Sequence, residues 1–207
     1  MAETDRWYDV AVIGAGPAGA VFAMRLGQMR PDLHVLLMDG QSETNKKVCG
    51  GLLAPDAQKV LASLGLTLPN SVLADPQIFA VDTLDLNAGQ RRLYQRHYLN
   101  MDRYAFDRWL VSMIPPQVDI IHARCDAMDV CEDGYTLTVR GTTYCAKTIV
   151  GADGANSHVR KTFGSIIQLG AIWQAINTRS HYSIDMQKYN FFSSHLPVDT
   201  KKTTLNL

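Results

Sequence analysis

The sequence predicts an α/β protein with a parallel β-sheet, on the basis of two apolar runs and the helical segment between them. Residues 8–14 (YDVAVIG) and 33–39 (LHVLLMD) are short and almost continuously apolar, which is typical of strands buried on both faces of a parallel sheet. Residues 17–29 place small or apolar side chains three to four positions apart, which predicts a helix that packs on that sheet. The three segments form a β-α-β unit.

The remainder of the predicted domain continues this pattern as far as residue 164. The further predicted elements are helices at residues 55–64 and 101–114, strands with one exposed face within residues 71–98, a sheet strand at 118–122, a small β-meander at 127–139 and 142–145, and a strand at 146–150. From residue 165 onward the chain is rich in Ser, Thr, Asn and His and has no clear periodicity. We therefore expect one folded domain over residues 1–164 and a tail over residues 165–207 that is not a folded domain.

Composition and charge narrow the possible functions. The chain has 207 residues, of which 46% are hydrophobic and 19% charged, and this is enough to bury a core. Its 20 basic and 20 acidic residues balance, so we expect no nucleic-acid partner. The cysteines form no CxxC pair and lie near no histidine at zinc-ligand spacing, so no metal site is predicted. Without a leader-like segment or a long apolar run, we expect a cytoplasmic protein with at most peripheral membrane contact.

A glycine-rich motif joins the first predicted strand to the first predicted helix. In GAGPAG, Gly14 permits a tight turn, Gly16 lets the backbone approach a pyrophosphate, and Gly19 allows close packing of helix on strand. Asp39, at the end of the second strand, would accept hydrogen bonds from an adenosine ribose. The alternative for Asp39 is a solvated strand-end residue. The motif predicts a dinucleotide site and leaves open whether NAD or FAD is bound.

Four motifs, in this order along the chain, resemble the FAD-dependent geranylgeranyl reductase family. They are residues 12–19 (VIGAGPAG), 47–51 (KVCGG), 103–110 (RYAFDRWL) and 150–160 (VGADGANSHVR). The stretches similar to a bacterial subgroup linked with colicin M resistance are residues 49–58, 76–81 and 94–100. The resemblance implies a Rossmann-like FAD/NAD(P)-binding domain that binds FAD, with NAD(P)H as the electron donor. It also implies that the chain ends before the family's substrate-binding half.

The resemblance further implies roles around the flavin for particular residues. Arg103 would reach the cofactor, the Asp153-Gly154 turn would lie near the pyrophosphate and ribityl chain, and the loop of residues 49–51 would lie beside the isoalloxazine ring. The alternatives are that Arg103 is a surface residue, that Asp153 only forms the turn, and that Cys49 is packed and inert. The predicted cofactor-binding residues are Gly14, Gly16, Pro17, Ala18, Gly19, Asp39, Cys49, Gly50, Gly51, Arg103, Asp153 and Gly154. No catalytic residue is assigned, because the family's substrate-facing half is expected to be absent.

The function that the resemblance implies is that of an FAD-dependent oxidoreductase with a small-molecule or lipid substrate. Hydride would pass from NAD(P)H to the flavin and then to a double bond of an isoprenoid-like lipid. One alternative is an FAD-dependent monooxygenase or hydroxylase, since such enzymes share the glycine motif and the Asp-Gly motif. The loop of residues 47–51 favours the reductase. An alternative of another class is a non-catalytic FAD-binding fragment.

Overall fold

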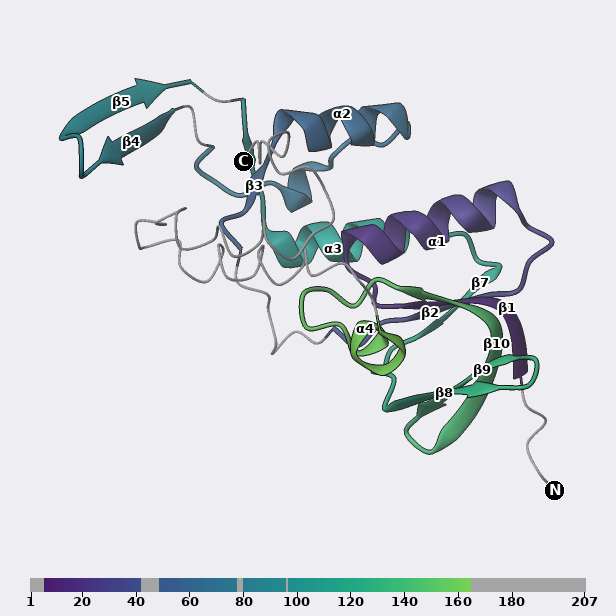
Figure 1. The fold of residues 1–207 in the computed structure, drawn as a ribbon. Coiled ribbons are helices and arrows are strands. Elements are labelled where there is room, and N and C mark those ends of the chain that lie inside the picture. The colour runs from purple at the N-terminus through teal and green to yellow at the C-terminus, as the bar shows by residue number, and fades with distance from the viewer. Residues whose placement is uncertain (1–5, 42–48, 78–79, 96, 165–207) are drawn as a thin grey trace.

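The computed structural model describes residues 6–41, 49–77, 80–95 and 97–164, and its centre is a six-stranded sheet (Figure 1). The strand order is β7-β2-β1-β10-β9-β8. The strands are β1 (Arg6–Ile13), β2 (Val35–Met38), β7 (Val118–Ile121), β8 (Ala127–Cys131), β9 (Gly134–Val139) and β10 (Thr142–Gly151). Strands β7, β2, β1 and β10 run parallel, and β9 and β8 continue the sheet antiparallel. The predicted parallel sheet with a small meander is confirmed.

Helix α1 (Pro17–Met29) covers one face of the sheet, and the meander curls over the other. Successive side chains of a strand point to opposite faces, so each central strand contributes to two apolar clusters. Val12 and Val35 pack with Ala23 of α1 on one face. Leu36 packs with Leu137 of β9 on the other face. The two continuous apolar runs of the sequence therefore reflect strands buried on both sides, as predicted.

Strand β10 differs from the prediction of two separate strands at residues 142–145 and 146–150. It is one strand of 10 residues that pairs antiparallel with β9 from Thr142 to Ala146 and parallel with β1 from Tyr144 to Gly151. A strand has two edges, so it can change partners along its length without a break in the backbone. The meander and the parallel sheet are consequently one continuous structure.

Helix α3 (Arg103–Ser112) packs beside α1 in a layer above the sheet (Figure 1). Its first turn is capped by Asp102, whose carboxylate accepts the backbone N–H of Ala105 at 2.9 Å, so the helix begins two residues later than predicted. Phe106 and Leu110 of α3 pack with Ala20 of α1 in a third apolar cluster. This packing holds the polar side chains of α3 near the end of the sheet.

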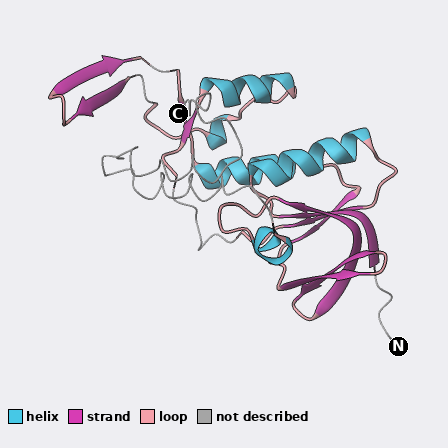
Figure 2. Cartoon of the chain, viewed as in Figure 1, coloured by secondary structure: helices cyan, strands magenta, loops and turns pink. Residues whose placement is uncertain are grey.

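The shorter elements lie around α3 and after β10 (Figure 2). They are β3 (Leu52–Leu53), α2 (Pro55–Ser63), the 3-10 helix η1 (Asn70–Val72), β4 (Val81–Asp85), β5 (Gln90–Tyr94), β6 (Leu99–Asn100) and α4 (His158–Phe163). Strands β4 and β5 form a hairpin that projects away from the main sheet, and its described side chains are exposed on both faces. The prediction of one buried face there was wrong, because the main sheet and its helices do not cover the hairpin.

Two predictions fall on residues that the structure does not describe. The predicted tail, residues 165–207, and the first two residues of the 47–51 motif both lie outside the described ranges. Within those ranges, no helix is long and apolar enough to cross a membrane.

Candidate dinucleotide site

The parallel strands β1, β2 and β10 end at one edge of the sheet, and each runs into a predicted site residue. Gly14 follows β1, Asp39 follows β2, and Asp153 lies in the turn after β10. The three turns are joined by backbone hydrogen bonds, from the N–H of Gly14 to the carbonyl of Met38 at 3.0 Å and from the N–H of Ala152 to the carbonyl of Ile13 at 2.8 Å. In open α/β sheets, ligands bind outside this edge.

The glycine motif at the junction of β1 and α1 has no room for a side chain at Gly14 or at Gly19. Gly14 has φ +105°, and a Cβ there would lie 2.5 Å from the carbonyl oxygen of Ala152. A Cβ on Gly19 would collide with the carbonyl oxygen of Gly14. These glycines therefore have the packing roles that the motif predicts: a tight turn, and close approach of α1 to the strands.

The N-terminus of α1 presents backbone donors at this edge for which the described part of the chain supplies no side-chain cap. Gly16 is the N-cap and makes no side-chain cap, while Pro17 at the first helical position has no N–H to satisfy. The N–H groups of Ala18 and Gly19 have no acceptor within the helix, because the first turn lacks preceding carbonyls. Free amides and the helix dipole together favour an anion such as a pyrophosphate.

Asp153 has one oxygen engaged in the fold and one without a partner. Its Oδ2 accepts the backbone N–H groups of His158 at 2.5 Å and Val159 at 3.2 Å, which stabilises the start of α4. Its Oδ1 is buried and has no hydrogen-bond partner among the described residues. Asp153 is thus a turn former, as one interpretation held, and it also keeps a free acceptor beside the Gly14 turn. Gly154 follows it with φ +84° and is exposed.

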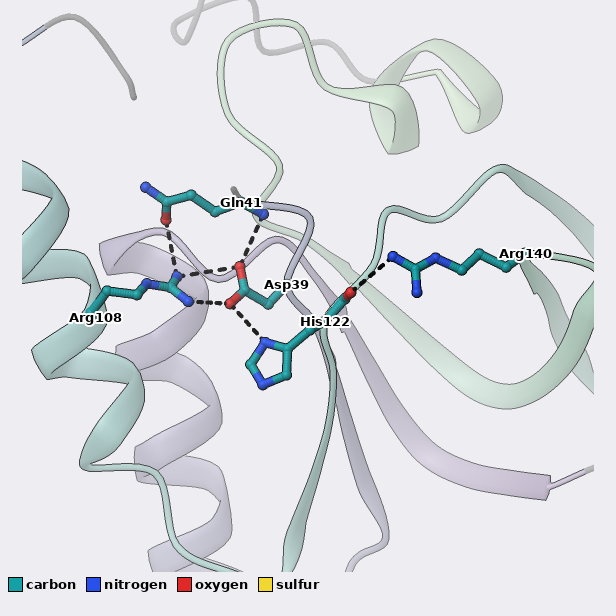
Figure 3. Close-up of polar contacts among 5 residues, drawn as sticks. All are labelled: Asp39, Gln41, Arg108, His122 and Arg140. Carbon is teal, nitrogen blue, oxygen red and sulfur yellow. Dashed lines mark hydrogen bonds and ion pairs between the residues drawn. The ribbon is translucent and has the colours of Figure 1, made fainter. Parts of the chain in front are cut away.

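Asp39 is buried and lies among donors from three parts of the chain (Figure 3). Arg108 of α3 contacts both carboxylate oxygens through Nη1 and Nη2. The backbone N–H of Gln41 donates to Oδ1 at 3.1 Å, and Nδ1 of His122 lies 3.3 Å from Oδ2. Asp39 is only 1% exposed, so the interpretation as a solvated strand-end residue was wrong.

The ionised state of Asp39 depends on these contacts. Burial alone would raise the pKa of Asp39, but the hydrogen bonds from Arg108 and from the Gln41 backbone outweigh it and lower the pKa below its usual range. Arg108 is held in turn by the side-chain oxygen of Gln41 at 3.0 Å and lies over the ring of Tyr104, 5.7 Å from its centre. Arg108 and His122 were not predicted as site residues from the sequence. The one clue was that Arg108 belongs to the 103–110 motif.

Arg103 and the Cys49 loop lie together at the N-terminal end of α3. Nε of Arg103 donates to Oδ1 of Asp107 at 2.8 Å, and its Nη1 lies 3.8 Å from Sγ of Cys49. Asp107 is fully buried, and its Oδ2 has no partner among the described residues. Gly51 adopts φ +69° and donates its N–H to Sγ of Cys49 at 3.5 Å, while Gly50 is exposed. The fold therefore joins two motifs that are 54 residues apart in sequence.

Residues 9–187 match a protein-family model described as lycopene cyclase protein. The chain belongs to the lycopene cyclase protein family. This places the β-α-β unit and the three later motifs within one FAD-dependent family and confirms the recognition of a flavoprotein from the sequence. The narrower assignment to the geranylgeranyl reductase type stays a prediction.

The relatives of this lycopene cyclase family member include bacterial proteins. Protein CbrA of Escherichia coli (strain K12) is 44% identical over an alignment of 164 residues that covers 74% of this chain and 45% of that protein. Protein CbrA of Shigella dysenteriae serotype 1 (strain Sd197) shows the same identity and coverage. The chain spans about half the length of the curated relatives that it matches.

Solved structures with the same fold are flavin-dependent enzymes. The monooxygenase PieE, in complex with FAD and substrate, has a TM-score of 0.59 at 18% identity, covering 78% of this chain and 33% of that chain. The brominase Bmp2 has a TM-score of 0.61 at 17% identity, covering 76% and 41%. p-Nitrophenol 4-monooxygenase PnpA of Pseudomonas putida DLL-E4 has a TM-score of 0.58 at 20% identity, covering 77% and 44%. The predicted Rossmann-like FAD-binding fold is confirmed.

Proposed function

We propose that this chain is the FAD-binding part of an FAD-dependent oxidoreductase, and that the ADP portion of FAD binds outside the carboxyl ends of β1, β2 and β10. The observation that carries the proposal is the place of Asp153, whose Cα would lie 2.8 Å from a Cβ on Gly14 and whose buried Oδ1 has no partner among the described residues. A buried acceptor without a partner is costly, and a ligand hydroxyl would satisfy it. The uncapped N-terminus of α1 supports an anion at the same edge.

The proposed roles of the individual residues follow from their positions. The amides of Ala18 and Gly19 would bind the pyrophosphate, with Gly14, Gly16 and Pro17 shaping the approach. Asp39 would bind the adenosine ribose, and Arg103 would donate to pyrophosphate or flavin oxygens. The Asp153-Gly154 turn would bind the ribityl side, and residues 49–51 would lie beside the isoalloxazine ring.

The reaction proposed is reduction of a double bond in an isoprenoid-like lipid, with NAD(P)H as the electron donor and a cytoplasmic location. FAD, when bound, supplies the hydride chemistry, and the protein supplies binding and orientation. Membership of the lycopene cyclase protein family supports an isoprenoid-like substrate. The described residues contribute the cofactor half of such a site, and none of them is proposed as a catalytic acid or base.

A monooxygenase is the second candidate, because the fold is shared with the monooxygenases PieE and PnpA. The two reactions differ in their use of oxygen. A monooxygenase consumes oxygen when NAD(P)H and substrate are supplied, whereas a reductase consumes NAD(P)H and substrate under anaerobic conditions. A chain that binds FAD and does neither would be a non-catalytic FAD-binding fragment.

The test of cofactor binding is visible absorbance of the desalted protein after incubation with FAD, compared with Gly16→Val. Val at the helix N-cap would block the approach of a pyrophosphate to the first-turn amides, so the variant is expected to lose the yellow colour. Ala62→Val, an exposed position on α2, adds the same kind of side chain away from the site and is expected to keep it. Equal FAD retention by all three proteins would exclude the proposed site.

A further inference from the structure

The carboxylate of Asp39 already has all of its acceptor positions filled by the protein. A carboxylate offers about four lone-pair directions, two on each oxygen. Oδ1 accepts from the Gln41 backbone at 3.1 Å and from Nη2 of Arg108 at 3.3 Å. Oδ2 accepts from Nη1 of Arg108 and lies 3.3 Å from Nδ1 of His122. A ribose hydroxyl can therefore bind Asp39 only if one of these donors moves away.

His122 is the donor that is easiest to displace. Its side chain is 69% exposed, whereas the Arg108 side chain is 27% exposed. The imidazole of His122 makes a single contact at 3.3 Å, while Arg108 makes a two-point, charge-assisted contact and is anchored by Gln41 as well. In Figure 3, His122 and Arg108 approach the carboxylate from different sides, so the imidazole can turn away without disturbing the guanidinium.

We propose that Arg108 is a positioning residue for the adenosine ribose, holding the Asp39 carboxylate in a fixed orientation while a ribose hydroxyl replaces His122 at Oδ2. This inference rests on the proposed function, in which the ADP portion of FAD lies at this edge of the sheet. The guanidinium keeps the buried carboxylate ionised and fixes both oxygens, which leaves the His122 side as the direction open to a ligand. Arg108 thereby determines how strongly the site selects a nucleotide with ribose hydroxyls.

The test compares ADP with 2′,3′-dideoxy-ADP, by isothermal titration of the full chain. A hydrogen bond to a charged acceptor changes affinity by about tenfold or more, so the wild-type protein is expected to prefer ADP by at least that factor. Arg108→Met is expected to bind both nucleotides with nearly equal affinity. His122→Ala is expected to keep the preference and to bind ADP as tightly or more tightly. Arg92→Met, on the exposed β5 strand, is the matched control and is expected to match the wild type.

The ratio of the two dissociation constants separates positioning from a general structural role. A variant that is only less stable loses apparent affinity for both nucleotides by the same factor, because fewer of its molecules are folded, and it therefore keeps the ratio. If Arg108→Met does not fold, Arg108→Lys decides, because it keeps the charge and loses the two-point contact; it is expected to show a smaller ratio than wild type. A wild-type ratio in the folded Arg108 variant overturns the inference and leaves the proposed function standing. A wild-type chain that binds neither nucleotide overturns both.

Discussion

Removal of Arg108 is expected to destabilise the protein, because it leaves the Asp39 carboxylate buried without its counter-charge. Asp39 is 1% exposed, and breaking a buried ion pair from one side costs about 3–5 kcal/mol. The Arg108 side chain is 27% exposed, so water reaches the pair and reduces the expected loss for Arg108→Met to about 2–3 kcal/mol. For a chain of 207 residues, this corresponds to a fall in Tm of about 4–12 °C.

A double-mutant cycle in urea, followed by far-UV circular dichroism at neutral pH, measures this loss. Asp39→Asn removes the charge that Arg108 compensates, so adding it to Arg108→Met is expected to recover at least about 1 kcal/mol of the loss. The exposed Arg92→Met is expected to stay within about 0.5 kcal/mol of wild type. If Arg108→Met were no less stable than Arg92→Met, the contact between Arg108 and Asp39 would not stabilise the fold, contrary to this prediction.

Three further predictions concern pH, the glycine turn and thiol reactivity. Because the pKa of Asp39 is lowered, its ionised carboxylate stabilises the fold above about pH 4, and this stabilisation is lost as the pH falls through the lowered pKa. The free energy of unfolding in urea should therefore depend less on pH in Asp39→Asn than in the wild type across the acid range. An equal pH dependence in the two proteins would contradict this. Gly14→Ala should lower the free energy of unfolding by about 2 kcal/mol or more in the same assay, because Gly14 has φ +105° and a Cβ there lies 2.5 Å from the Ala152 oxygen. Gly50→Ala, whose Cβ would have no atom within 4 Å, should lower it by less than about 0.5 kcal/mol. Burial raises the pKa of Cys125 to about 11, so little of its thiol is ionised at mildly alkaline pH. Iodoacetamide should therefore alkylate Cys125 more than about tenfold more slowly than free cysteine, as followed by peptide mass spectrometry. A rate equal to that of free cysteine would show an accessible thiolate.

The elements that could be predicted from the sequence are those whose pattern is local. The apolar runs of β1 and β2 and the small residues of α1 each report burial through their own periodicity, and the β-α-β unit follows from them. The continuity of β10 could not be predicted in this way. Its composition changes near residue 146 because its pairing with β9 ends there while its pairing with β1 continues to Gly151.

In the candidate site too, some residues could be predicted from the sequence and others could not. The glycine turn and Asp39 could be predicted, because they adjoin a recognisable strand end in a known motif. The partners of Asp39 could not, because Arg108 reaches it from a helix 69 residues further along the chain and His122 from a turn 83 residues away. Both contacts exist only once α3 and β7 are packed beside β2. Side chains that depend on tertiary packing leave no periodic pattern in the sequence.

The measurement that tests the proposed FAD site most directly is a fluorescence titration of the full chain with FAD and, separately, with FMN. FMN carries the flavin and one phosphate but lacks the AMP portion, so a site built from the α1 N-terminus, Asp39 and Asp153 should distinguish the two. Saturable FAD binding that ADP displaces is expected, with FMN binding at least about tenfold more weakly. Equal affinity for FAD and FMN, or failure of ADP to compete, would contradict the placement of the adenosine half at this edge of the sheet.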